Sequence, residues 1–188
     1  LRLKLIIFTM KIHHFSLLLI FISSLTLAQN DRVEGKIIKD FGETFNIEKP
    51  DIKTNVDADL KVIFDVSQSS DDKSVRNKYI ETAARFLNMH ANAGMTNDQL
   101  YVAMTIHGGA WQDILNDEAY KELYGIPNPN SEMIKALNEA GVHIILCGQT
   151  KSYRKVKDDD VIPEVKLSLS AMTSLIQYQN KGYRFIKF

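Results

Sequence analysis

Cysteine is the scarcest chemically useful residue in this chain: its 188 residues contain only Cys147. A single cysteine excludes an intramolecular disulfide and the paired-cysteine motifs of redox and zinc sites. Three histidines follow residue 28, namely His90, His107 and His143, and they stand too far apart to show a metal-ligand spacing. The sequence therefore predicts neither a disulfide framework nor a metal site.

Signatures of nucleotide and nucleic-acid binding are also missing. The chain has no Gly-x-Gly-x-x-Gly fingerprint and no P-loop lysine motif, so we expect no resident cofactor. It carries 23 basic and 23 acidic side chains and no basic stripe interleaved with aromatic residues, which argues against nucleic-acid binding. A content of 45% apolar and 24% charged residues is typical of a globular protein, and the length suits one domain with a substantial core.

The first 28 residues lack acidic side chains altogether. After Met10, Lys11 and two histidines form a basic region, residues 15–22 form an apolar run, and residues 26–28 are a Thr-Leu-Ala cleavage site. This order predicts a secretory signal peptide over residues 1–28, with residues 1–9 consistent with a mis-called start. The apolar run is too short for a stable membrane span. We therefore expect export, to the periplasm or beyond, with a retained N-terminal anchor as the alternative.

The chain after the leader divides into an arm and a domain. Residues 29–58 mix glycines, a proline and scattered charge with short apolar pieces, and we expect an extended arm that packs on the domain or on a neighbouring subunit. Over residues 59–188, strand-like apolar runs alternate with helical patterns. The expected strands are 60–66, 100–106, 142–147 and 183–188, and the expected helices are 75–93, 110–124 with a break near Asn116, one that begins near residue 130, and one capped by Ser168 or Ser170.

Strands that alternate with helices indicate a parallel sheet covered on both faces. The fold class predicted for residues 59–188 is therefore α/β, as a three-layer α/β/α sandwich with a mainly parallel sheet of about five strands. In the last helix, the apolar residues Met172, Leu175 and Ile176 are expected to face the core.

Three of the predicted strands end in small or polar residues: Ser67-Gln68, His107-Gly108-Gly109 and Cys147-Gly148-Gln149. In an open parallel sheet, ligands bind beyond the carboxyl ends of the strands. We therefore expect these three segments to converge on one edge, with His107 close to Cys147 although 40 positions separate them.

The Cys147 thiol has two interpretations. A following helix N-terminus and the nearby cations Lys151, Arg154 and Lys155 would favour a reactive thiolate. Free cysteine is also among the most buried residue types, so the thiol could be an inert core group. In the same way, His107 could be functional or could be a strand-end histidine that hydrogen-bonds to the backbone. The residues alone leave both questions open.

Six short segments, in this order along residues 60–188, resemble the DsrE/DsrF-like family of sulfur-relay proteins, and the likeness is to its exported, stand-alone members. These segments are Ala84 to His90, Thr105 to Ala110, Asn128-Pro129-Asn130, Cys147-Gly148-Gln149, Leu169 to Met172 and Gln179 to Tyr183. The resemblance implies a parallel-sheet sandwich that assembles into homo-oligomers, often trimers or hexamers. It also implies that the cysteine matching Cys147 carries sulfur as a persulfide.

The leading hypothesis is therefore a periplasmic sulfur carrier or sulfurtransferase. Cys147 and His107 would be catalytic, and the backbone around Gly108-Gly109 and Gly148-Gln149 would bind the anionic donor. The partners would be a small sulfur compound or a thiol-bearing protein, besides further copies of the chain. The second hypothesis is a non-enzymatic homo-oligomeric module that binds a small ligand or acts as a scaffold, in which Cys147 is inert.

Overall fold

A computed structural model describes residues 32–188, so the predicted signal peptide and the first residues of the arm lie outside the described residues. Five parallel strands form the central sheet, in the order β6-β5-β4-β3-β7. These strands are β3 (Leu60–Val66), β4 (Leu100–Ile106), β5 (His143–Cys147), β6 (Lys166–Ser168) and β7 (Arg184–Lys187). The prediction of a mainly parallel sheet of about five strands is confirmed.

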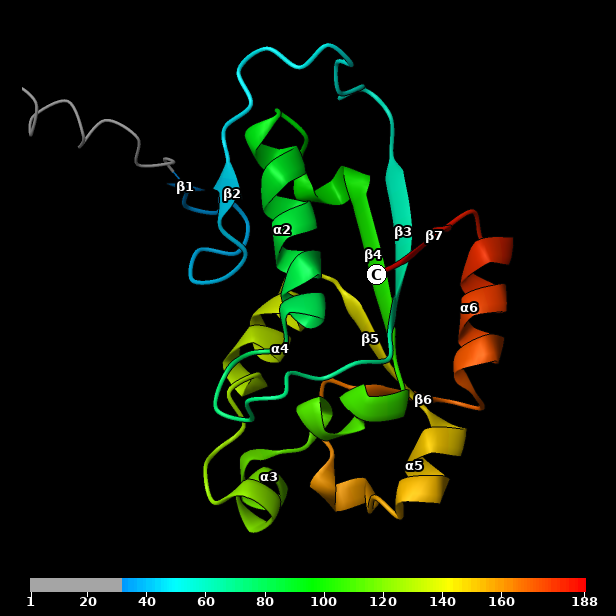
Figure 1. The fold of residues 1–188 in the computed structure, drawn as a ribbon. Coiled ribbons are helices and arrows are strands. Elements are labelled where there is room, and N and C mark those ends of the chain that lie inside the picture. The colour runs from blue at the N-terminus through cyan, green and yellow to red at the C-terminus, as the bar shows by residue number, and fades with distance from the viewer. Residues whose placement is uncertain (1–31) are drawn as a thin grey trace, which may run out of the picture. The chain divides into compact units, whose positions relative to one another are not determined.

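Helices cover both faces of this sheet. Helices α2 (Lys78–Asn92) and α4 (Ser131–Glu139) lie on one face, and α6 (Ala171–Asn180) lies on the other (Figure 1). The shorter helices are η2 (Asn97–Gln99), η3 (Gly108–Ile114), α3 (Asp117–Tyr124), α5 (Gly148–Arg154) and η4 (Asp158–Asp160). Of these, η3, α3 and α5 gather where the strands end. Among residues 32–188, no helix combines the length and apolar character needed to cross a membrane.

The main core lies between the sheet and the pair α2 and α4. Phe64, Met104 and Ile144 stand in register on three neighbouring strands, and each is at most 1% exposed. Ile80 and Leu87 of α2 are fully buried in the same cluster. Burial of a side chain of this size stabilises the fold by about 1.5–3 kcal/mol. The strands read as nearly continuous apolar runs because the sheet is covered on both faces.

The arm packs on the domain of its own chain. Its strands β1 (Arg32–Val33) and β2 (Thr44–Phe45) pair antiparallel, and the loop between them wraps around the buried side chain of Asn88 in α2. The Asn88 amide donates to the carbonyl oxygens of Ile38, Phe41 and Gly42, and its oxygen accepts from the N–H groups of Ile37 and Ile38. Ile38 itself is 4% exposed and joins the main core. Residues 32–188 form one compact unit.

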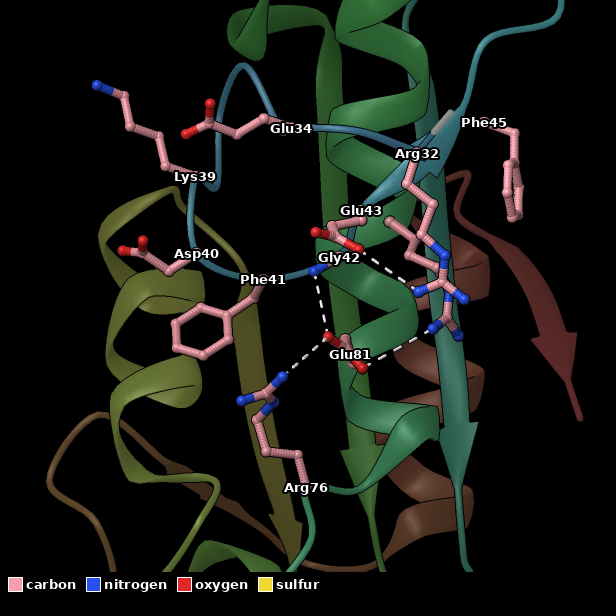
Figure 2. A pocket seen from close by; sticks show the side chains of 11 residues that line it. Arg32, Glu34, Lys39, Asp40, Phe41, Gly42, Glu43, Phe45, Arg76 and Glu81 are labelled. Atoms are coloured by element: carbon pink, nitrogen blue, oxygen red, sulfur yellow. Dashed lines mark hydrogen bonds and ion pairs between the residues drawn. The ribbon is translucent and has the colours of Figure 1, made fainter. Parts of the chain in front are cut away.

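A cavity of about 690 Å³ opens between the arm and α2 (Figure 2). Several of its charged side chains pair with one another. The Glu81 carboxylate accepts from the Gly42 N–H at 3.2 Å and pairs with Arg76 and Arg85, each at 3.9 Å, while Arg32 pairs with Glu43. The Gly42–Glu81 bond fastens the loop between β1 and β2 to the first turn of α2, on the face of the sheet opposite α6.

The predicted helix 110–124 is divided near Asn116, as expected. The 3₁₀ helix η3 ends at Ile114, and the Asn116 side chain then caps α3 by accepting from the Ala119 N–H. Strand β6 had no counterpart among the expected strands because its sequence, Lys166-Leu167-Ser168, has no apolar run. It pairs through its backbone with β5 at the edge of the sheet.

The predicted orientation of the last helix is wrong. Met172 is 71% exposed and Ile176 is 58% exposed, while Leu175 is half-buried. Helix α6 instead faces the sheet through Ala171 and Ser174, and the hydroxyl groups of Ser174 and Thr105 lie 3.0 Å apart. Small residues let the helix approach the strands closely, and the larger apolar side chains consequently point outward.

Candidate functional site

The three strand ends expected to converge do so, since β3, β4 and β5 are parallel neighbours in the sheet. The Thr105–Ser174 contact fixes which residues of β4 face α6. Residue 145 is in register with Thr105, and side chains alternate along a strand, so Cys147 also faces α6. His107 follows Thr105 by two residues in extended backbone and faces the same way. Cys147 and His107 therefore lie on adjacent strands and on one face.

The Cys147 side chain is enclosed by main-chain donors. The residue is 4% exposed and lies at the junction of β5 with α5. Burial acts to raise the pKa of its thiol, but the N–H groups of Thr150, Ala171 and Gln149 and the Thr150 hydroxyl act against burial, and the net effect lowers the pKa. Within residues 32–188, none of these donors makes a hydrogen bond of regular geometry to the sulfur. Such bonds are often long in an unliganded site and shorten when charge develops.

Gly148 allows the thiol to lie this close to the start of α6. A Cβ atom at Gly148 would stand 2.5 Å from the carbonyl oxygen of Ser168 and 3.1 Å from that of Leu169. The neighbouring Gln149 side chain donates to the same Leu169 carbonyl at 3.3 Å. Both residues thus hold the segment between β6 and α6 beside Cys147. That Gly148 and Gln149 bind the anionic sulfur donor stays a prediction.

His107 is held by a carboxylate rather than by the backbone. Its Nε2 lies 2.6 Å from Oδ1 of Asp65 in β3, and the other oxygen of Asp65 lies 3.0 Å from Nζ of Lys187 in β7. The Asp65 side chain is 5% exposed, whereas that of His107 is 27% exposed. Within the described chain, no hydrogen bond joins His107 to Cys147. Sequence reasoning missed Asp65 and Lys187, although one acid inside the apolar run 60–66 was a visible signal.

The glycines after His107 serve the backbone. Gly108 has a φ of +57°, and a Cβ there would stand 2.8 Å from the carbonyl oxygen of Ser67. The Gly109 N–H donates to that same oxygen at 2.7 Å. The pair therefore ties the loop after β3 to the start of η3, and the Gly109 N–H is already engaged. Anion binding by Gly108 and Gly109 stays a prediction.

Two of the three cations expected to favour a thiolate, Lys151 and Arg154, are engaged elsewhere. Lys151 pairs with Asp158 at 2.9 Å, and the Arg154 guanidinium lies over the rings of Trp111 and Tyr153. No group of three or more potential metal ligands occurs among residues 32–188. The structure thus associates the lowered pKa of Cys147 with local N–H and O–H donors rather than with these side chains.

A second buried polar cluster is structural. Burial raises the pKa of Asp113 to about 6, against the opposing effect of hydrogen bonds from Asn77 and Ser69. Asn77 is also the N-cap of α2, and its N–H donates to the Asn130 side chain. Asn128 in turn donates to the carbonyl oxygens of residues 113 and 115. The Asn128-Pro129-Asn130 motif therefore joins η3 to α2 and makes no hydrogen bond to the thiol within residues 32–188.

The model of the DsrE/DsrF-like family matches residues 61–188 of this chain. The chain belongs to the DsrE/DsrF-like family. The match spans the whole central sheet except Leu60, together with α6 and both Cys147 and His107, so the fold and the candidate site lie within it. A search of curated proteins found no match.

Two solved structures are similar to this chain at low sequence identity. A protein of unknown function, MTH1491 from Methanobacterium thermoautotrophicum, is 17% identical with a TM-score of 0.52; the alignment covers 69% of this chain and 100% of that one. The YchN protein from E. coli is 12% identical with a TM-score of 0.48, over 69% of this chain and 99% of its own. At 17% identity, the likeness to MTH1491 shows the fold alone.

Proposed function

We propose that this protein carries sulfane sulfur as a persulfide on Cys147. The observation that carries the proposal is the thiol at the carboxyl edge of the sheet, where donors from two chain segments lower its pKa. Those from residues 149 and 150 belong to α5, and that from Ala171 begins α6. A thiolate is the nucleophilic form of cysteine. Family membership supports sulfur relay as the broader role.

The chemistry needs no oxidant when the donor is already a persulfide. The Cys147 thiolate attacks the terminal, sulfane sulfur of the donor, a new S–S bond forms on Cys147, and the S–S bond of the donor breaks. The donor leaves as a thiolate that takes up a proton. A later attack by an acceptor thiolate on the outer sulfur of Cys147 would pass the sulfur on and regenerate the thiol.

Mass spectrometry of the intact protein tests this proposal. After exposure to a low-molecular-weight persulfide, the wild-type protein should gain the mass of one sulfur atom, which a reductant then removes. The Cys147→Ser variant should gain none. Absence of the gain in wild type, or an equal gain in the variant, would overturn the proposal.

A second candidate function, a non-enzymatic ligand-binding or scaffold module, is favoured by the burial of Cys147 at 4% exposure. The two candidates predict different alkylation by iodoacetamide. Because the pKa of Cys147 is lowered, the carrier should show a pH midpoint of alkylation below that of a free cysteine measured alongside. Thr150→Val removes the hydroxyl donor and should raise the midpoint. A slow alkylation rate that changes neither with pH nor with Thr150→Val would favour the inert module.

Self-association is part of the proposed function. Residues 167–180 contain no charged side chain. They expose Leu167, Leu169, Met172 and Ile176 by 58–72% on the outer surface of α6 and the segment before it. An apolar, uncharged surface beside the thiol suits contact with another copy of the chain, because identical neutral surfaces meet without like-charge repulsion. We propose a homo-oligomer, a trimer or hexamer, built through this surface.

Export also belongs to the proposal. The basic, apolar and small-residue order of residues 10–28 supports a cleaved leader and a periplasmic location. Fractionation of the native host should recover a shortened protein outside the cytoplasm. Recovery of the full-length chain in the cytoplasm would overturn this part without affecting the chemistry at Cys147.

A further inference from the structure

Four neighbouring strands contribute one polar side chain each to the carboxyl end of the sheet, on the face covered by α6. In the order of the strands these are Cys147 from β5, His107 after β4, Asp65 from β3 and Lys187 from β7. Asp65 is in register with both Thr105 and residue 187, so all four side chains face α6. The proposed function uses Cys147 alone and leaves His107, the buried Asp65 and its partner Lys187 without a role.

The contacts of Asp65 define the state of the His107 ring. An ionised carboxylate only accepts hydrogen bonds, so the 2.6 Å contact assigns the proton to Nε2 of His107. In a neutral ring, Nδ1 then holds the free lone pair, and within residues 32–188 it has no hydrogen-bond partner. The Lys187 ammonium lies 3.0 Å from the second oxygen of Asp65 and pairs with the carboxylate from the side away from β4.

The register of the strands places His107 beside Cys147. Ile106 and Leu146 are the last registered pair of β4 and β5, so His107 and Cys147 are the next pair along. Neighbouring strands lie about 4.8 Å apart, and side chains of a registered pair stand on the same face. An imidazole anchored at one nitrogen by a carboxylate, with the other nitrogen beside a thiol, is the arrangement that Cys–His nucleophiles use.

We propose that Asp65 and Lys187 are positioning residues for proton transfer, which hold His107 in the Nε2–H tautomer so that Nδ1 exchanges a proton with Cys147 and with the departing thiol. The inference rests on the proposed persulfide chemistry and deepens it. Nδ1 takes the proton of Cys147 as the thiolate forms, and the thiolate attacks the sulfane sulfur of the donor. The proton then passes from Nδ1–H to the thiolate that leaves. Overall, the Cys147 thiol and a donor persulfide become the Cys147 persulfide and the donor thiol.

Two readouts on the full mature chain test the proposal. The first is the rate of sulfur uptake from a low-molecular-weight persulfide, followed by quenching and intact-mass analysis. The second is the tautomer of His107, read from long-range proton–nitrogen NMR spectra of protein labelled with ¹⁵N-histidine. A residue with a merely structural role would leave the tautomer unchanged.

Asp65→Asn is the decisive variant because its amide can donate to Nε2 and so favour the Nδ1–H tautomer. We expect the NMR signature to switch and the uptake rate to fall about 100-fold, the size typical of a lost general acid or base. His107→Gln should lower the rate similarly. Lys187→Met should lower the uptake rate less and give a mixture of the two His107 tautomers. Arg184→Met, at the other end of β7, should match wild type in both readouts.

The outcomes separate this inference from the proposed function. If wild type takes up no sulfur, the persulfide function fails, and the proton route fails with it. If wild type takes up sulfur, but Asp65→Asn keeps both the rate and the Nε2–H tautomer, only the role of Asp65 is overturned. Should Asp65→Asn not fold, wild-type rates in both His107→Gln and Lys187→Met would overturn the proposal equally well.

Discussion

Helices α2 and α6 cover opposite faces of one sheet and meet it in opposite ways. Helix α2 buries Ile80, Leu87 and other apolar residues against the strands, and its outer side receives the arm through Asn88. Helix α6 buries Ala171 and Ser174 and leaves Met172 and Ile176 in solvent. The first helix is covered on both sides by its own chain, whereas the second is covered on one.

The two faces of the sheet therefore have different roles: the α2 face stabilises the chain, and the α6 face carries the candidate site and the exposed apolar surface. The α2 face carries the main core and the buried polar contacts that fix the arm, so substitutions there should act on the stability of the chain. The α6 face carries a close contact with the strand ends, the candidate site and an uncharged apolar surface. Substitutions there should act on the geometry of the site or on assembly.

The largest expected effect comes from breaking the contact between α2 and the arm. Asn88→Ala removes five hydrogen bonds to the backbone of residues 37–42 and leaves a small void beside Ile38. A buried polar group that loses its partner is destabilising by about 1–3 kcal/mol. Part of the arm can detach and be hydrated, so we expect a loss of about 3 kcal/mol in the free energy of unfolding, measured by urea denaturation.

Asn92→Ala is the matched control, one turn further along the same helix. Its amide donates once to the arm, to the Thr44 hydroxyl, and its side-chain oxygen is buried without a partner among the described residues. Removing a buried oxygen that has no partner is favourable and offsets part of the cost of losing the bond to Thr44. The free energy of unfolding should therefore fall by less than about 1 kcal/mol. Equal losses for the two variants would contradict the central role given to Asn88.

A smaller effect is expected where α6 touches the sheet. Ser174 is 2% exposed and its hydroxyl contacts Thr105. Ser174→Leu would insert apolar volume at the point of closest approach and push the helix outward, at a cost of about 2 kcal/mol. Because Ala171 and the Cys147 thiol lie at the start of this helix, the alkylation rate of Cys147 should change as well. Ser174→Ala, which keeps the spacing, should cost only about 1 kcal/mol and leave that rate unchanged.

The same contrast explains what the sequence could predict. The strands 60–66 and 100–106 were predictable because burial on both faces demands continuous apolar runs, and α2 was predictable because its apolar residues face a deep core. For α6 the same rule failed: Met172, Leu175 and Ile176 form an apolar stripe, but Ala171 and Ser174 allow the closer approach. Strand β6 carries no apolar signal, since backbone pairing alone places Lys166–Ser168 in the sheet.

At the candidate site, sequence reasoning found residues that follow or end the strands β4 and β5 and missed Asp65 and Lys187, which lie within β3 and β7. The convergence of His107 with Cys147 followed from the parallel order of the strands. The pairing of His107 with Asp65 did not, although the lone acid in the run 60–66 was a visible signal. Lys187 was missed because it lies on a strand whose position beside β3 depends on the crossover through α6. Which strands are neighbours is a long-range property, and no local pattern encodes it.

The smallest expected effect on chain stability comes from the outer surface of α6. Met172→Glu with Ile176→Glu places two charges on residues that are 71% and 58% exposed, so the free energy of unfolding of the isolated chain should change by about 0.5 kcal/mol or less. Assembly should respond strongly, because the new charges would face identical charges across a contact between copies. Light scattering coupled to size-exclusion chromatography should show the wild-type oligomer and a monomeric variant.

Met89→Glu, at an exposed apolar position of α2, is the control and should assemble as wild type does. If both variants keep the mass of the wild-type particle, the α6 surface is not the interface; if Met89→Glu alone dissociates it, the interface lies on the α2 face.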